Sequence, residues 1–216
     1  MKKLSLFFIF CSLCFNAHGL ESNSTYIGED MAVITDWTDN DSGDGVSSQG
    51  TFDTQSSMRL LSGASESGNY SSRFLDYGSA PSIITISIKL YHSALGSRGD
   101  TDRLDIYLGF GAERFDLNFA TDGLFFVDTT TTELGTNLVS TGVWQEWDFV
   151  INRTAHTFDT WLDGVKVGDA VGWLYSSSLT DGLFYMYQYG NTTANRSTYI
   201  DYIRIGDGTS RHLVGG

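Results

Sequence analysis

Three tyrosines stand at alternate positions in the segment DGLFYMYQYG. They are Tyr185, Tyr187 and Tyr189, and the apolar Phe184 and Met186 fall on the other positions. Successive side chains of a β-strand point to opposite faces. The spacing therefore predicts a strand with three phenol rings on one face and apolar residues in the core. The row of rings is either a platform for a ligand or ordinary packing at the rim of a sheet.

Other segments share this division into an apolar and a polar side. In Ser82–His92 the isoleucines alternate with Lys89 and Tyr91, and two later segments carry Tyr107 and Asn118 on their polar sides. Aromatic rings stack on the apolar faces of pyranose sugars, and planar polar groups hydrogen-bond the sugar hydroxyls. These polar sides therefore predict a surface that binds a polysaccharide. Its candidate substrate-binding residues are Tyr91, Tyr107, Arg114, Asn118, Tyr185, Gln188, Tyr189 and Arg196.

Short runs of alternating polarity recur along the whole chain, and turn sequences such as Asp163-Gly164 and Asp181-Gly182 separate them. With 24 glycines and a single proline, the pattern predicts an all-β fold, a two-sheet antiparallel β-sandwich. The expected strands are Met31–Trp37, Thr51–Leu61, Ser82–His92, Arg103–Phe110, Glu113–Ala120, Gly123–Asp128, Val143–Asn152, His156–Leu162, Val165–Gly168, Leu183–Gly190 and Ser197–Ile205.

The first residues have the pattern of a secretory signal peptide. A basic start at Lys2 and Lys3 precedes an apolar run and a small-x-small cleavage site that ends at Gly19. We expect a signal peptide over residues 1–19, a single domain over residues 20–216, and secretion to the periplasm or the extracellular space. Both cysteines lie in the expected signal, so the mature chain is expected to contain no disulfide.

The charge balance restricts the choice of partners. The chain has 13 basic and 26 acidic residues, which gives a formal net charge of −13. This charge argues against nucleic acid and anionic membranes as partners. No apolar run after the expected signal is long enough to cross a bilayer. An acidic polysaccharide would require a local cluster of basic side chains.

Two segments resemble a known superfamily. The segment WQEWDFVINRTAHTFDTWLDGVKVG, residues 144–168, looks like the central hairpin of concanavalin A-like (laminin G-like) jelly rolls. There, a W-x-x-W-x-F-x-I strand turns into a strand that ends in W/Y-x-D-G-x-x-V. The segment STYIDYIRIGDG, residues 197–208, is similar to the closing strand of the same superfamily. The resemblance covers residues 26–207 and implies a concanavalin A-like jelly roll, a fold shared by lectins, glycosidases and polysaccharide lyases.

The stretch YMYQYG further resembles a strand of alginate-lyase-like jelly rolls. Lyases of this type cleave a uronate-containing glycan by β-elimination. A cation neutralises the carboxylate, a base removes the C5 proton, and an acid protonates the leaving oxygen. The resemblance implies Tyr187 as the base, with Lys89 and Arg73 among the cations. His92 is either a further catalytic residue or a structural one. It falls on the same side of its strand as the isoleucines, but it stands at the end of that strand.

We therefore expect a secreted, polysaccharide-active protein and favour a polysaccharide lyase that cleaves a uronate-containing glycan by β-elimination. The alternatives are a non-catalytic carbohydrate-binding lectin or module and a structural or adhesion protein. Glycoside hydrolysis is disfavoured, because Glu146 and Asp148 do not complete the E-x-D-x-x-E strand that hydrolases of this fold carry.

A structural metal is also implied by the resemblance. In related jelly rolls the aspartate that matches Asp201 joins an acidic residue near the N-terminus to hold Ca²⁺, a hard ion that prefers oxygen ligands. Glu29 or Asp30 is the expected partner here. No organic cofactor is expected.

Overall fold

The computed structural model describes residues 24–29, 37–63, 70–79, 81–97, 103–109, 115–127, 131–172, 181–190 and 196–208. The expected signal peptide, Asp30 and Arg114 lie outside these ranges, as does nearly all of the strand expected at Met31–Trp37. Among the described residues there is no helix with the length and hydrophobicity that a membrane span requires.

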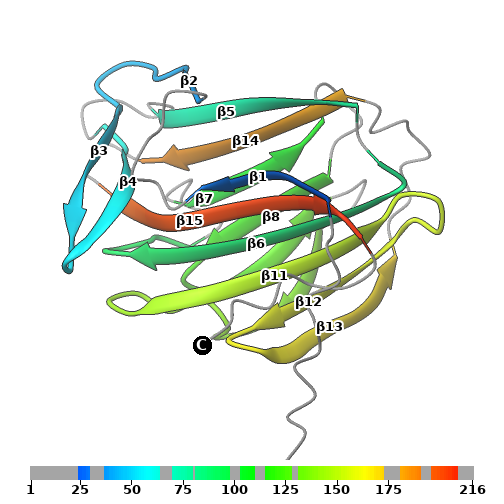
Figure 1. Ribbon diagram of the computed structural model, residues 1–216. Helices are drawn as coiled ribbons and strands as arrows, with labels where there is room; N and C mark the ends of the chain where they lie inside the picture. The colour runs from blue at the N-terminus through cyan, green and yellow to red at the C-terminus, as the bar shows by residue number, and fades with distance from the viewer. Residues whose placement is uncertain are drawn as a thin grey trace, which may run out of the picture.

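The described strands form two antiparallel sheets that pack face to face (Figure 1). Sheet A, in front in this view, contains β1 (Ser24–Glu29), β3 (Val46–Phe52), β4 (Gln55–Leu61), β6 (Ile83–His92), β11 (Trp144–Asn152), β12 (Thr157–Leu162), β13 (Val165–Gly172) and β15 (Ser197–Asp207). Sheet B contains β2 (Thr38–Asp39), β5 (Tyr70–Ser79), β7 (Leu104–Leu108), β8 (Phe115–Ala120), β9 (Gly123–Val127), β10 (Thr131–Gly135) and β14 (Asp181–Tyr189).

Neither sheet follows the order of the sequence. Sheet A runs β13-β12-β11-β6-β15-β4-β3, with β1 also paired to β15, and sheet B runs β10-β9-β8-β7-β14-β5-β2. The arrangement confirms the predicted two-sheet antiparallel sandwich.

The core lies between the sheets and is built by alternation along the strands. In β6 of sheet A, Ile86 and Ile88 are at most 1% exposed and point inward. In β14 of sheet B, Phe184 and Met186 are fully buried, and the alternating Tyr185, Tyr187 and Tyr189 stand on the outer face. The predicted division of the segment DGLFYMYQYG is therefore confirmed. Burying side chains of this size stabilises the fold by about 1.5–3 kcal/mol each.

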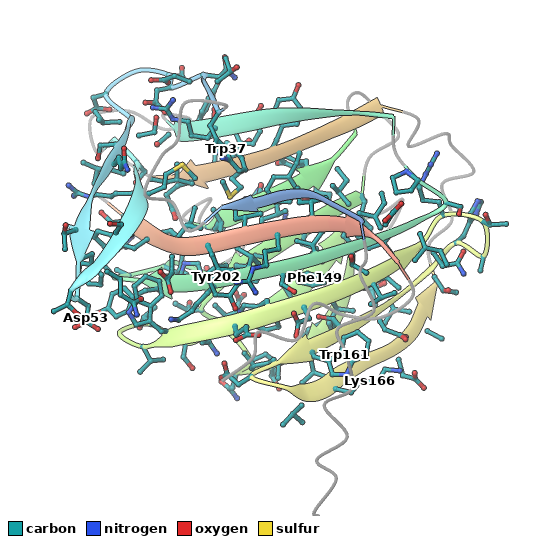
Figure 2. The ribbon with its side chains drawn as sticks, in the orientation of Figure 1. Trp37, Asp53, Phe149, Trp161, Lys166 and Tyr202 are labelled. Atoms are coloured by element: carbon teal, nitrogen blue, oxygen red, sulfur yellow. The ribbon has the colours of Figure 1, made fainter. Side chains whose placement is uncertain are left out.

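The strand expected at Thr51–Leu61 is in fact a hairpin of β3 and β4. Asp53 and Thr54 form its turn, at whose tip Figure 2 labels Asp53, and both have a positive φ, +49° and +68°. A two-residue turn with positive φ at both positions matches the right-handed twist of the strands. Such turns usually contain glycine, and the lack of one in this turn explains why the residue pattern did not predict it.

Strand β15 carries a bulge that changes which residues face outward. The pairing of β15 with β6 shifts between Ile200 and Tyr202. Ile200, Ile203 and Ile205 are fully buried, while Asp201 and Tyr202 are consecutive residues on the outer side. A bulge inserts one extra residue, so the simple alternation of faces is interrupted at this point.

Candidate functional site

The outer face of sheet B carries the tyrosine ladder predicted from sequence. Neighbouring rings of Tyr185, Tyr187 and Tyr189 stack nearly parallel, with centroids 6.0 Å and 5.8 Å apart and interplanar angles of 18° and 17°. All three side chains are half-buried, so part of each ring reaches solvent. Their position on β14, with β5 and β7 as neighbours, keeps the three rings in register.

Two tyrosines on the neighbouring strands flank this ladder. Tyr70 of β5 meets Tyr187 edge-on with centroids 5.2 Å apart, and Tyr107 of β7 meets it from the other side, also at 5.2 Å. Edge-to-face contacts of this kind add about 0.5–1.5 kcal/mol beyond burial and hold the rings in place. The set Tyr70, Tyr107, Tyr185, Tyr187 and Tyr189 is called the tyrosine face below.

Charged and polar side chains adjoin the tyrosine face. Arg103, which precedes β7, lies over the ring of Tyr189 at 5.4 Å and donates from Nε to Asp105 Oδ1 at 2.8 Å. The Tyr107 hydroxyl donates to the other oxygen of Asp105, also at 2.8 Å. In β8, the Asn118 amide donates to Asp116 Oδ1 at 2.8 Å. These bonds fix the orientation of the polar groups in advance of any ligand.

The environment of Tyr187 and Tyr107 keeps their phenols protonated. Burial raises the pKa of Tyr187, and the neighbouring Tyr189 and Tyr70 raise it further, against a smaller opposing effect of a hydrogen bond with Asn40. Burial also raises the pKa of Tyr107, as do the negative charges of Asp105 and Asp116. An unperturbed phenol has a pKa near 10. Tyr187 and Tyr107 are therefore protonated at neutral pH, and Tyr187 lacks the lowered pKa that the predicted role of a base requires.

Lys89 and Tyr91, predicted to share a site with Tyr187, lie on the other sheet. Both are in β6 of sheet A, and their side chains are on its outer face, beside β11 and β15. The outer faces of the two sheets point in opposite directions because the cores of both face inward (Figure 1). The structure therefore does not bring Lys89 or Tyr91 to the tyrosine face.

His92 and Gln188, predicted as catalytic and substrate-binding residues, are both buried between the sheets. His92 is 1% exposed and Gln188 is fully buried. Nδ1 of His92 lies 2.8 Å from Thr198 Oγ1, and the Thr198 hydroxyl donates to Gln188 Oε1. The side-chain amide of Gln188 donates to the carbonyls of Arg103 and Tyr189. A glycan on either outer face would not contact these residues, and we assign them to the interior.

The two remaining predicted arginines also lie apart from the ladder. Arg73 of β5 is paired with Met186 and so shares its inward side; at the sheet edge it forms an ion pair with Asp39 at 3.3 Å and donates to the Trp37 carbonyl. Arg196 lies just before β15, and its backbone nitrogen and carbonyl bond to Ser62. Lys89 and Arg73 are therefore directed away from the tyrosine face, while the contacts given for Arg196 are those of its backbone.

The residues expected to hold calcium have other surroundings. The Asp201 carboxylate accepts a hydrogen bond from Lys89 Nζ at 2.7 Å. Glu29 in β1 is paired through its backbone with Ile203, two residues along β15 from Asp201. No group of three or more metal-ligating side chains occurs in the part of the chain that the structure describes. A calcium site on these residues stays a prediction.

Sequence reasoning missed Tyr70. It lies in YSSRFLDYGS, the sequence of β5, whose first inward positions are Ser71 and Arg73. Because neither of these is apolar, the start of the strand lacks the alternation that identifies a half-buried strand. Arg103, Asp105 and Asp116 were visible as polar-side residues, but only the structure joins them to the ladder.

Comparison with known proteins supports the fold. No protein-family model matches the sequence, and no curated protein is similar to it in sequence. Among solved structures the chain is similar to a sialidase at 11% identity and a TM-score of 0.64. The match covers 85% of this chain and 19% of the sialidase chain. It is also similar to an endo-β-1,4-glucuronan lyase from the fungus Trichoderma reesei, at 14% identity and a TM-score of 0.63. This match covers 86% of this chain and 96% of the lyase chain.

The chain is likewise similar to a mutant of the carbohydrate recognition domain of Emp46p, at 14% identity and a TM-score of 0.52. This match covers 88% of this chain and 98% of that domain's chain. Identities this low show a common fold and leave the activity open. The chain thus has the jelly-roll fold, while it spans only about a fifth of the sialidase that it matches.

Proposed function

We propose that this protein binds a polysaccharide through the tyrosine face of sheet B. The observation that carries the proposal is the ordered aromatic surface itself: three parallel rings on one strand, with a further ring edge-on at each side of Tyr187. A pyranose ring has apolar C–H faces that fit such rings, and its hydroxyls need planar donors and acceptors at the margin. Asp105, Asp116 and Asn118 lie beside the ladder but are at most 4% exposed, so they hold their neighbours in place, and the half-buried phenols of Tyr185, Tyr187 and Tyr189 are the groups that a sugar would contact.

The protonated state of the phenols fits binding. A phenol whose pKa is raised donates a hydrogen bond to a sugar oxygen over the whole neutral range. Asp105, which accepts hydrogen bonds from Arg103 and Tyr107, holds both groups in a fixed orientation. A surface prepared in this way loses little conformational entropy when a ligand binds.

A second candidate function is β-elimination on a uronate-containing glycan. The observation that favours it is Arg103, whose guanidinium lies against the end of the tyrosine ladder. A guanidinium there would pair with a uronate carboxylate. In a concerted elimination the Tyr187 hydroxyl would give its proton to the leaving oxygen and take the C5 proton in exchange, so that the C4–O bond breaks, the C4=C5 bond forms and the phenol is regenerated. The fold similarity to a glucuronan lyase is consistent with this reaction.

One experiment tests both candidates. The protein is run in affinity gels containing alginate, pectin, glucuronan or a neutral glucan, and the same mixtures are followed by absorbance of the unsaturated product in the ultraviolet. We expect retardation in at least one polysaccharide gel. Tyr187→Ala should raise the Kd by roughly tenfold, because a well-placed aromatic contact contributes up to about 1.5 kcal/mol and about 1.4 kcal/mol corresponds to a factor of ten.

The matched control is Tyr202→Phe, which removes a phenol hydroxyl on the outer side of sheet A, where Arg204 covers the ring. It should leave retardation unchanged. Retardation that is the same in Tyr187→Ala and wild type would refute binding at the tyrosine face. A rise in absorbance that Tyr187→Phe abolishes, with retardation retained, would establish the lyase; a complete lack of product on every uronate glycan would leave binding alone.

A further inference from the structure

Sheet A carries a second group of aromatic side chains, on the face opposite to the tyrosine face. Arg59 of β4 is paired directly with Tyr199 of β15, Tyr199 with Tyr91 of β6, and Tyr91 with Trp144 of β11. Directly paired residues of adjacent strands point to the same face. Since neighbouring strands are about 4.8 Å apart, the four residues form a row about 14 Å long across the sheet.

Phe52 is the fifth residue of this group and its fourth aromatic ring. Phe52, at the end of β3 next to the hairpin turn, stacks on Tyr199 with centroids 3.8 Å apart and an interplanar angle of 14°. It also contacts Tyr91 at 4.7 Å and Trp144 at 6.1 Å. All four rings are half-buried, so each keeps a solvent-exposed part. The residues Phe52, Arg59, Tyr91, Trp144 and Tyr199 are called the aromatic row.

The charges beside the aromatic row are not balanced. At the Trp144 end, Lys89 lies over the indole ring at 5.4 Å and is neutralised by Asp201 at 2.7 Å. At the other end, the Arg59 guanidinium lies over Tyr199 at 5.8 Å and donates only to the Ser197 hydroxyl among the described residues. No described carboxylate forms an ion pair with Arg59. In a chain with a net charge of −13, such a cation beside exposed rings is suited to an anionic ligand.

Anchoring of the hairpin explains only part of this arrangement. The stacking of Phe52 on Tyr199 holds the curled β3–β4 hairpin against sheet A and needs nothing further. It does not account for the arginine at one end of the row, which no described carboxylate neutralises, nor for the extension of the row over β6 to Trp144. Aromatic rings in a line, with a guanidinium at one end and the Gln55 amide 3.4 Å from Lys89 Nζ, are the groups that recognise an acidic sugar.

We propose that the aromatic row is a second polysaccharide-binding site, which takes an acidic sugar unit whose carboxylate pairs with Arg59. The site shares no residue with the tyrosine face and does not depend on it. Because the two outer faces point in opposite directions, each site would hold a separate stretch of polysaccharide.

The test measures binding of polygalacturonate, a linear polyuronate, and of a neutral glucan to five proteins by affinity gel electrophoresis. They are the wild type, Arg59→Gln, Arg59→Lys, Arg204→Gln and Tyr187→Ala. Arg204 is the matched control, because it lies on the same face of sheet A over the ring of Tyr202 and outside the aromatic row. Melting curves confirm that each variant is folded, and Arg59→Lys retains the charge if Arg59→Gln is unstable.

We expect Arg59→Gln to raise the Kd for polygalacturonate by roughly tenfold, as loss of a charge-assisted hydrogen bond does. Binding of the neutral glucan should be unaffected, Arg204→Gln should match the wild type, and Arg59→Lys should restore most of the affinity. Tyr187→Ala should retain the part of the polygalacturonate binding that depends on Arg59. This result separates failure of the aromatic row from failure of the tyrosine face. Equal affinity of Arg59→Gln and wild type, or an equal loss in Arg204→Gln, would overturn the proposal.

Discussion

Acidification should destabilise the protein through His92. The imidazole is buried between the sheets, and Thr198 uses its only hydroxyl hydrogen to bond Gln188. His92 Nδ1 must therefore donate to Thr198, which leaves Nε2 without a proton and without a partner among the described residues. Burial lowers the pKa of His92 to about 3 from an ordinary value of 6.5.

The sign and size follow from proton linkage. Between those two pKa values the unfolded chain binds a proton at His92 and the folded chain does not, so stability falls as the pH falls from about 6.5 towards 3. At about pH 5 the loss from this one group is about 2 kcal/mol, and it grows to about 5 kcal/mol well below pH 3. Losses of this size are a large part of the stability of an ordinary domain.

The assay is urea unfolding followed by tryptophan fluorescence at about pH 7, 6 and 5. The variant His92→Gln keeps an amide donor for Thr198 but cannot be protonated. It is expected to be less stable than wild type at neutral pH, and its free energy of unfolding should fall by about 2 kcal/mol less between about pH 7 and pH 5. Subtracting the two pH profiles removes the contribution of the carboxylates, which both proteins share.

The control is His156→Asn, at a half-buried turn position with a φ of +54° that asparagine tolerates. It should keep the wild-type profile. If His92→Gln lost stability on acidification as steeply as the wild type does, the buried neutral imidazole could not be the source of the pH dependence, and our reasoning would be wrong.

Three further outcomes are expected. Thr54→Gly should raise the free energy of unfolding by about 1 kcal/mol in a urea titration, because Thr54 has a φ of +68° that glycine adopts without strain; an unchanged or lower value would contradict this. A double-mutant cycle with Lys89→Met and Asp201→Asn should give a coupling of about 1 kcal/mol, since both side chains are mostly buried; a coupling of zero would exclude a stabilising pair. If Ca²⁺ binds at Asp201, the ion should raise the melting temperature and Asp201→Asn should abolish the rise; identical melting with Ca²⁺ and with chelator would remove the metal.

The sequence by itself determined which side of each strand faces the core. The alternation in β6 and β14 placed Ile86, Ile88, Phe184 and Met186 inside and the tyrosine ladder outside, because a strand with one buried face cannot slip by a residue without exposing its apolar side chains. The W-x-x-W hairpin and the closing strand were likewise sufficient to identify the type of sandwich.

Only the tertiary structure decided which residues share a surface. A sandwich has two outer faces. Alternation along a strand distinguishes its buried side from its exposed side, but it does not show to which of the two outer faces the exposed side belongs. Lys89 and Tyr187 were therefore both correctly expected outside, yet they belong to different sheets, since pairing joins β6 to β11 and β15 but β14 to β5 and β7. The bulge after Ile200 and the glycine-free turn at Asp53 and Thr54 depend on long-range pairing in the same way, and local sequence carries no signal for them.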